Sequence, residues 1–402
     1  MAFTKQKGLE DIKLLVALHT EGVNIAPKDF KDLDYENTYA EQIHAGVDWN
    51  FENYVSSKIP TGFRLKTTTF LSRLFWNPSS RYSVVKEGEK FLLIKGKDEV
   101  IDEVEFEKKP KFYNKKTSDG KDMSRIVQAG DRGRVGISYS NECALFDKGL
   151  DCLFCNINDT KRRFGELDHI EWKNVQEIGE AVAEAYKEGY RGYNLTGGFV
   201  PERREVEYYL DVIEAVKEHT GIEDIHGMAC VGAPSDLSII EKYKEAGYQH
   251  IATNIEIWDE NIFKTICPGK EQLCGGRQNW INTLKKEVEV FGKGNVRSCL
   301  VAGIEPKKSL LEGIEYLASL GVIAQASIWK PCIGSALEGH RTPSIEWHQE
   351  VAEKVYQIHK KAGFTLEQLY YVDGSDTIQA YYHKLDGESL PWEEKLDLQA
   401  DL

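Results

Sequence analysis

The sequence predicts an α/β fold in which a parallel β-sheet is covered by helices. From about residue 132 onward, strand-like and helix-like segments alternate, and this alternation is typical of consecutive β-α units. Several helical segments also end in a glycine just past their apolar stripe, which is a common helix stop. Six β-α units are predicted in this way, whereas residues 1 to about 125 lack the alternation.

The expected strands are short runs rich in β-branched and aromatic residues. They cover residues 135–140, 192–196, 225–231, 250–257, 296–302 and 322–330. Helical patterns follow at 175–188, 205–219, 237–246, 279–291, 310–320 and 344–362. A seventh strand is considered at 368–372, before an acidic tail that runs to Leu402. The expected divisions are an N-terminal extension (1–125), a core (126–340) and a C-terminal helix with the additional strand and tail (341–402).

The N-terminal extension is expected to have an α+β structure. It contains a helical pattern, an aromatic-rich middle that includes Trp49 and Phe75, and a hairpin-like pairing of residues 91–94 with 100–106. Two positions for this extension are equally open. It either covers the mouth of the core or closes its bottom.

The composition and net charge restrict the kinds of partner and the cellular location expected for the protein. The 402-residue chain has a formal net charge of -14, which argues against a broad nucleic-acid surface. It contains no apolar run of about 18 residues and no apolar N-terminal segment of the signal-peptide type, so a cytoplasmic location without membrane contact is expected. Eight cysteines without the density of a secreted disulfide framework favour reduced thiols and a reducing, anaerobic cell.

Three closely spaced cysteines follow the first expected strand: Cys143, Cys152 and Cys155. In a parallel α/β barrel the loops at the carboxyl ends of strands build the active site. A structural zinc site needs four protein ligands, whereas a cubane iron-sulfur cluster held by three thiolates leaves one iron open. The alternative is a zinc site whose fourth ligand comes from His169, Cys230 or Cys274.

The cysteine motif resembles that of the radical S-adenosylmethionine (SAM) superfamily. The segment Cys152-Leu153-Phe154-Cys155 fits the spacing of its last two cysteines, including the aromatic residue before the third. The first gap departs from the usual three residues, because eight residues separate Cys143 from Cys152. The resemblance implies a partial (βα)6 TIM-like barrel, a 4Fe-4S cluster on the three cysteines, bound SAM, and a flavodoxin- or ferredoxin-type electron donor.

Further segments resemble the SAM-binding elements of this superfamily. Thr196-Gly197-Gly198 is similar to its Gly-Gly-Glu element, which contacts the SAM amino group, although Phe199 replaces the acid. Glycines at a strand end also allow a close backbone approach. On the fourth strand, alternation is expected to place Asn254 and Glu256 on one face, toward ribose hydroxyls and an ammonium group.

The fourth and fifth strands are similar to those of the biotin synthase and HydE-type group. There a glutamate at the position of Glu256 contacts SAM, and an arginine in the next helix pairs with the SAM carboxylate. Arg277 is the nearest candidate here. On the fifth strand the resemblance implies that Leu300 and Ala302 face the nucleoside, that Cys299 points outward, and that Glu305 braces the following turn.

Two residues are singled out as candidates for the chemistry on the substrate. Cys230 has the strand parity of a residue that faces the barrel interior, where a thiol could donate hydrogen or bind a second cluster, although an isolated buried cysteine is more often a small hydrophobic residue. Lys330 follows the sixth strand near the expected barrel mouth, as do Trp258, Trp329 and His340 at other loops.

Three classes of function are compatible with these features. The favoured one is a radical SAM enzyme in which a 5'-deoxyadenosyl radical abstracts hydrogen from a small metabolite or cofactor precursor. The acidic balance and the lack of a cysteine after Cys332 disfavour a member acting on RNA or protein. The third class is a non-catalytic, metal-stabilised binding module.

Overall fold

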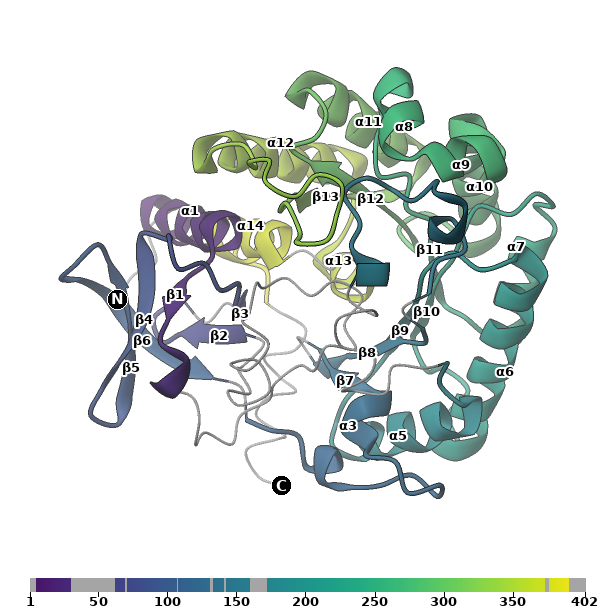
Figure 1. Cartoon of the computed structure of the whole chain (residues 1–402), viewed down its shortest axis with the longest axis horizontal. Coiled ribbons are helices and arrows are strands. Elements are labelled where there is room, and N and C mark those ends of the chain that lie inside the picture. The colour runs from purple at the N-terminus through teal and green to yellow at the C-terminus, as the bar shows by residue number, and fades with distance from the viewer. Residues whose placement is uncertain are drawn as a thin grey trace.

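Two β-sheets organise the chain (Figure 1). The computed structural model describes residues 5–29, 62–68, 71–106, 108–130, 133–140, 142–159, 172–372 and 376–389. The expectations for Trp49, His169 and the acidic tail concern residues outside these ranges. One sheet is built from the N-terminal extension, and the other forms the wall of a partial barrel.

The barrel sheet has seven strands in the order β13-β12-β11-β10-β9-β8-β7. Strands β8 to β13 pair in parallel, and the two-residue β7 is antiparallel to β8 at one edge. The α/β partial (βα)6 TIM-like barrel expected from the sequence is therefore confirmed. The strands are β7 (Gln128–Ala129), β8 (Val135–Ser138), β9 (Tyr193–Thr196), β10 (Gly227–Cys230), β11 (His250–Ala252), β12 (Val296–Ala302) and β13 (Ile323–Ile328).

Helices connect successive strands and lie around the outside of the sheet (Figure 1). All six helical patterns expected from the sequence are helices within three residues at either end. Two short helices that the sequence analysis missed, α8 and α9, stand between β11 and α10. The helices are α5 (Val175–Lys187), α6 (Glu202–Thr220), α7 (Ile239–Ala246), α8 (Glu260–Ile266), α9 (Pro268–Leu273), α10 (Gly276–Phe291), α11 (Lys307–Leu320) and α12 (Ile345–Ala362).

The fourth strand is shorter than expected. β11 ends at Ala252, and residues 253–257 continue only as an isolated bridge between Glu256 and Leu300. The hydroxyl of Ser298 accepts a hydrogen bond from the backbone N–H of Ile255 (3.0 Å), in place of a regular strand partner. Glu256 has φ 68°, a left-handed conformation that is uncommon for a residue with a side chain. The alternation assumed for this segment therefore does not apply.

The N-terminal sheet has six strands in the order β1-β4-β5-β6-β2-β3. The expected hairpin is confirmed, because β5 and β6 pair antiparallel. The α1 helix precedes the sheet and packs against α12 and α14 (Figure 1). The elements before β7 are α1 (Lys5–Glu21), β1 (Asn24–Ile25), η1 (Pro27–Asp29), β2 (Gly62–Leu65), β3 (Leu71–Arg73), β4 (Tyr82–Glu87), β5 (Lys90–Lys95), β6 (Glu99–Phe106), η2 (Lys111–Asn114) and α3 (Met123–Ile126).

The additional strand considered at 368–372 is wrong, because this segment is the helix α13 (Leu366–Val372). Thr365 and Gln368 bond each other's backbone N–H groups through their side chains, which is a capping box at the start of a helix. Leu366, Leu369 and Tyr370 are buried at helical spacing. A further helix, α14 (Asp376–Asp386), follows and contacts α1.

No helix in the described ranges is both long enough and apolar enough to cross a membrane.

Candidate functional site

A cavity of about 560 Å³ lies at the carboxyl ends of the barrel strands. Its volume is in the usual range for small-molecule sites. Thr196, Cys230, Ala302 and Ile328 contribute to the lining from the ends of β9, β10, β12 and β13. Val16 of α1 lines the same cavity, so the N-terminal extension forms part of its wall instead of covering only the bottom of the barrel.

The three cysteines of the motif all line this cavity. The eight residues between Cys143 and Cys152 form the 3-10 helix η4 (Phe146–Lys148) and a left-handed turn at Gly149. The carbonyl of Leu150 then accepts a hydrogen bond from the backbone N–H of Gly269 (3.0 Å) in α9. The long first gap is therefore a turn that attaches the cysteine loop to the helices after β11.

The cysteine thiols are close enough to interact electrostatically. Burial raises the pKa of Cys143 and Cys155, and neighbouring cysteines raise both further. The pKa of Cys152 is instead lowered, mainly by a hydrogen bond from Cys267 and then by the positive charge of Lys270. Lys270 therefore favours negative charge beside the loop.

The donor set fits a three-thiolate cluster. Among the described residues, no group of three or more His, Cys, Asp or Glu side chains is arranged around one metal ion. A cubane does not require such an arrangement, because each thiolate binds a different iron atom. Three interacting thiols on one loop that opens into a cavity satisfy this geometry.

Gly197 and Gly198 allow the cysteine loop to pack against the end of β9. A Cβ on Gly198 would lie 1.9 Å from the carbonyl oxygen of Glu142, and one on Gly197 would lie 2.3 Å from the ring of Tyr139. The hydroxyl of Tyr139 also donates a hydrogen bond to the carbonyl of Gly198 (3.0 Å). Both glycines line the cavity, so they leave room for the loop and expose backbone to the cavity.

A buried ion pair lies beside the cysteines. The ammonium of Lys270 donates to a carboxylate oxygen of Glu256 (3.1 Å) and to the backbone carbonyl of Asn254 (2.8 Å). The two charged side chains are only 12% and 15% exposed. The sequence analysis selected Glu256 and missed Lys270, whose place depends on the unexpected helix α9.

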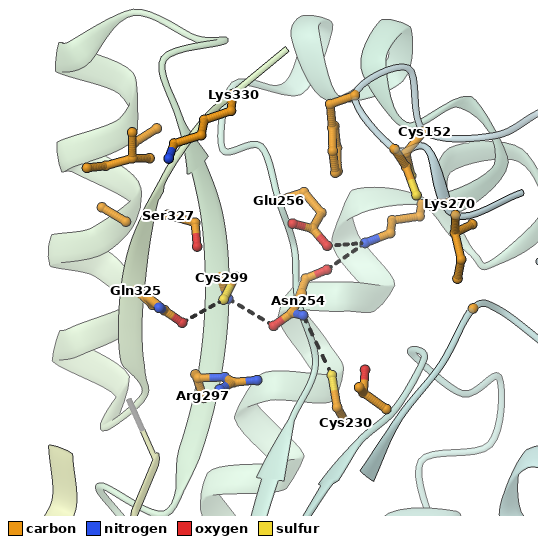
Figure 2. Close-up of a pocket in the computed structure, with 18 of the residues that line it drawn as sticks. Cys152, Cys230, Asn254, Glu256, Lys270, Arg297, Cys299, Gln325, Ser327 and Lys330 are labelled. Atoms are coloured by element: carbon orange, nitrogen blue, oxygen red, sulfur yellow. Dashed lines mark hydrogen bonds and ion pairs between the residues drawn. The ribbon is translucent and has the colours of Figure 1, made fainter. Parts of the chain in front are cut away.

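Hydrogen bonds connect neighbouring strands across the cavity floor (Figure 2). The Asn254 side chain donates to the sulfur of Cys230 (3.6 Å) and accepts from the backbone N–H of Cys299 (3.0 Å). The Cys299 thiol donates to the side-chain oxygen of Gln325 (2.9 Å). Asn254 and Cys230 thus reach the cavity as expected, and burial raises the pKa of the Cys230 thiol.

The prediction of which β12 side chains face the cavity is partly wrong. Ala302 lines the cavity, but Leu300 is fully buried outside it, whereas Cys299 lines it. Glu256 pairs its backbone with Cys299 and Val301 on either side of Leu300, at the position where the β11 segment leaves regular strand geometry. The strict alternation of a regular strand therefore predicts the wrong side of the sheet for both Leu300 and Cys299.

Arg277 also lies outside the cavity lining. Its Nε donates to the carbonyl of Trp258 (2.6 Å), and its guanidinium stacks 4.2 Å from the centroid of the Trp258 ring. Glu305 braces the adjacent turn as expected, because its carboxylate accepts from the backbone N–H groups of Trp258 (2.8 Å) and Asp259 (2.9 Å). Arg277 thus packs on this turn and not at the cavity, where it was expected.

Of the remaining substrate candidates, Lys330 lines the cavity, whereas Trp258, Trp329 and His340 do not. Phe154 lines it beside the cysteines. The sequence analysis also missed Glu205 in α6, which is 8% exposed and accepts from the backbone N–H of Gly232 (3.2 Å). Burial raises the pKa of Glu205 to about 8.

Comparison with known proteins identifies the family. A sequence model of the radical SAM superfamily matches residues 138–323, which include the cysteine loop and the strands from β9 to β12. Residues 138–323 form a radical SAM domain. Proteins of this superfamily use a 4Fe-4S cluster and SAM, and Cys143, Cys152 and Cys155 are the residues of this domain that fit the cluster.

Two curated relatives are similar to parts of the chain. Bacteriochlorophyllide c C-7(1)-hydroxylase from Chlorobaculum limnaeum is 28% identical over 261 residues, which cover 61% of this chain and 64% of the hydroxylase. 5-Amino-6-(D-ribitylamino)uracil--L-tyrosine 4-hydroxyphenyl transferase 2 from Methanosarcina barkeri (strain Fusaro) is 32% identical over 120 residues, or 28% of this chain and 30% of the transferase. Neither relative is matched over two thirds of its length.

Among solved structures, the FeFe-hydrogenase maturase HydG from Carboxydothermus hydrogenoformans superposes with a TM-score of 0.46 and 15% identity. The superposition covers 61% of this chain and 56% of HydG.

Replacement of Gly198 by alanine should destabilise the protein. The added Cβ would meet the backbone of Glu142 and force the cysteine loop away from β9, at an expected cost of about 1–3 kcal/mol in the free energy of unfolding. Gly136→Ala in β8 is the matched control, because nothing lies within 4 Å of its Cβ. Urea denaturation followed by circular dichroism measures both; equal stability of the two variants would contradict the close packing described here.

Replacement of Glu205 by glutamine should stabilise the protein progressively from pH 4.5 to about 8. The folded state holds a proton that the unfolded state releases above its ordinary pKa of 4.5, so the wild type loses up to about 1.4 kcal/mol per pH unit through this group until its folded pKa near 8. Glutamine keeps an oxygen acceptor for Gly232 without the charge.

The free energy of unfolding of this variant is measured by denaturant titration across the same pH range. Glu207→Gln, on the exposed face of the same helix, is the control and should change stability by less than about 0.5 kcal/mol. A constant difference between Glu205→Gln and the wild type at every pH would show that Glu205 stays ionised in the folded protein.

Proposed function

We propose that the protein is a radical SAM enzyme that acts on a small-molecule metabolite or cofactor precursor. When bound, the cluster and SAM supply a 5'-deoxyadenosyl radical that abstracts a hydrogen atom from the substrate. The observation that carries this proposal is that the three-cysteine loop, the glycine pair and the Glu256–Lys270 ion pair all line one cavity. The chain's own part in the reaction is to hold the reactants and exclude water.

The cysteine loop would hold the cluster, and its surroundings would favour the thiolate forms. Lys270 provides a positive charge near Cys152, and the buried thiol of Cys267 donates a hydrogen bond to it. Hydrogen bonds to ligand sulfurs and nearby charge are among the factors that tune iron-sulfur clusters. Phe154 lines the cavity beside these cysteines.

The SAM cradle is assigned to the ends of β9, β11 and β12. The backbone around Thr196, Gly197 and Gly198 is open to the cavity next to Cys143. Glu256 and Lys270 present a carboxylate and an ammonium side by side, and this pair is complementary to the two charges of an amino acid. We therefore transfer to Lys270 the carboxylate-binding role that the resemblance suggested for Arg277.

Ala302 and Asn254 complete the proposed nucleoside side of this cradle. Ala302 leaves space at the end of β12, and Asn254 is fixed by its bonds to Cys230 and Cys299. Cys230 lies on the cavity floor, where it could return a hydrogen atom to a substrate radical. Its hydrogen bond from Asn254 fixes the position of the sulfur.

The relatives support a small-molecule substrate. The hydroxylase is named for a bacteriochlorophyllide, and the transferase is named for a ribitylaminouracil and tyrosine. The net charge of -14 makes an RNA substrate the less favoured alternative. A flavodoxin- or ferredoxin-type protein would supply the electron, in the cytoplasm of an anaerobic cell.

Replacement of Cys152 by alanine should abolish the cluster and SAM cleavage. The protein is reconstituted anaerobically with iron and sulfide, its iron content is measured, and 5'-deoxyadenosine is quantified by mass spectrometry after addition of SAM and dithionite. Cys332→Ala is the matched control, because this cysteine lies outside the cavity and should leave both readouts unchanged. A wild-type protein that binds zinc tightly, forms no cluster and cleaves no SAM would instead indicate a binding module.

Replacement of Lys270 by methionine should weaken SAM binding by about 10- to 100-fold, because a charged hydrogen bond to the SAM carboxylate is lost. Arg277→Met should leave the affinity unchanged, since Arg277 packs on Trp258 outside the cavity. Equilibrium dialysis with labelled SAM measures both reconstituted variants at equal iron content. Weaker binding in the Arg277 variant alone would restore the role that the sequence resemblance suggested.

A further inference from the structure

One end of the cavity carries buried nitrogen atoms that the described protein leaves without hydrogen-bond partners. The Nζ of Lys330, which follows β13, is buried and has no hydrogen-bond partner among the described residues. The same is true of Nδ1 of His348 in α12. Both residues line the cavity. In Figure 2 Lys330 lies across the cavity from Cys152, the side on which the cluster is expected.

The surroundings of Lys330 are apolar and positively charged. Its ammonium lies 2.8 Å from the centroid of the Phe75 ring, in the segment after β3 of the N-terminal extension. Burial, together with the nearby charge of Arg73, holds the pKa of Lys330 well below its usual range. Cys332 is the titratable group that acts in the opposite direction. A cation–π contact alone compensates only part of the loss of hydration of a buried ammonium.

His348 is positioned to supply a second hydrogen-bond donor beside Lys330. It is 2% exposed, and its Nε2 is 2.9 Å from the hydroxyl of Thr342. Burial and the positive charges of Lys330 and Lys307 lower its pKa to about 4, so the ring is neutral at pH 7. When the Thr342 hydroxyl donates to Nε2, the neutral ring carries its proton on Nδ1, where it can donate.

We propose that Lys330 and His348 bind a carboxylate group of the substrate, with Arg73 contributing positive charge at the rim of this site. The inference rests on the proposed function, because it describes the substrate of the same cavity. Two donors match the two oxygens of one carboxylate, and the anion would compensate the buried lysine. The substrate would then extend from Lys330 toward Cys152, so that its reacting carbon lies between the two walls.

The test uses the reconstituted full-length enzyme and the smallest carboxylate probe, acetate. The melting temperature is measured with acetate, with the neutral isostere acetamide, and with inorganic phosphate, at constant sodium chloride and with and without SAM. We expect acetate to raise the melting temperature by about 2–4 °C near saturation and acetamide to leave it unchanged. A larger rise with phosphate than with acetate would overturn the assignment to a carboxylate.

Lys330→Met keeps the length of the side chain and removes its charge. We expect this variant to melt at a higher temperature than the wild type without probe, because a buried uncompensated amine is removed, and to lose the response to acetate. Lys264→Met, at an exposed lysine of α8, is the control and should keep the response. An acetate response that persists in Lys330→Met would overturn the inference.

Two further outcomes separate this inference from the proposed function. A response to acetate that disappears when SAM is bound would assign the site to SAM and overturn its assignment to the substrate. An enzyme that forms 5'-deoxyadenosine but never responds to acetate would overturn the inference alone. A protein that responds to acetate but cleaves no SAM would overturn the proposed function and leave an anion site.

Discussion

The close packing of the cysteine loop against two glycines is the constraint on which the site depends. Gly198 brings the loop against the end of β9, and Gly269 receives it on α9, where a Cβ would lie 2.4 Å from the carbonyl oxygen of Leu150. These contacts hold the loop between the end of β9 and α9. The thiols therefore occupy the same cavity as Glu256 and Lys270, although those charges come from segments more than 100 residues later.

Much of the barrel could be predicted because its signals are local. The alternation of strands and helices, the glycine stops and the cysteine spacing all depend on residues that are neighbours in the sequence. Asn254 and Glu256 reach the cavity as expected, but for a different reason, since the left-handed conformation at Glu256 replaces strand alternation. The helix α13 also had a local signal, the capping pair Thr365 and Gln368, which the strand interpretation overlooked.

The remaining errors concern tertiary geometry, which a single sequence does not contain. Arg277 had the right chemistry for a carboxylate, but the two short helices after β11 place Lys270 at the cavity instead. Cys299 lines the cavity in place of Leu300, because the irregular segment after β11 bridges to β12 at Leu300. Nothing in the local sequence of Glu205 indicated its burial, because Arg203, Arg204 and Glu207 around it are charged and its hydrogen-bond partner Gly232 lies in a distant loop.

The contribution of α1 and β3 to the cavity means that parts of its wall differ in origin. Barrel strand ends surround the cysteines, whereas Val16, Arg73 and Phe75 come from the chain before the barrel begins. Substitutions in this leading segment can therefore change the shape and charge of the cavity without disturbing the strand ends. Such a separation would allow the leading segment to adapt the cavity to a different ligand while the cysteine loop and the strand ends beside it stay unchanged.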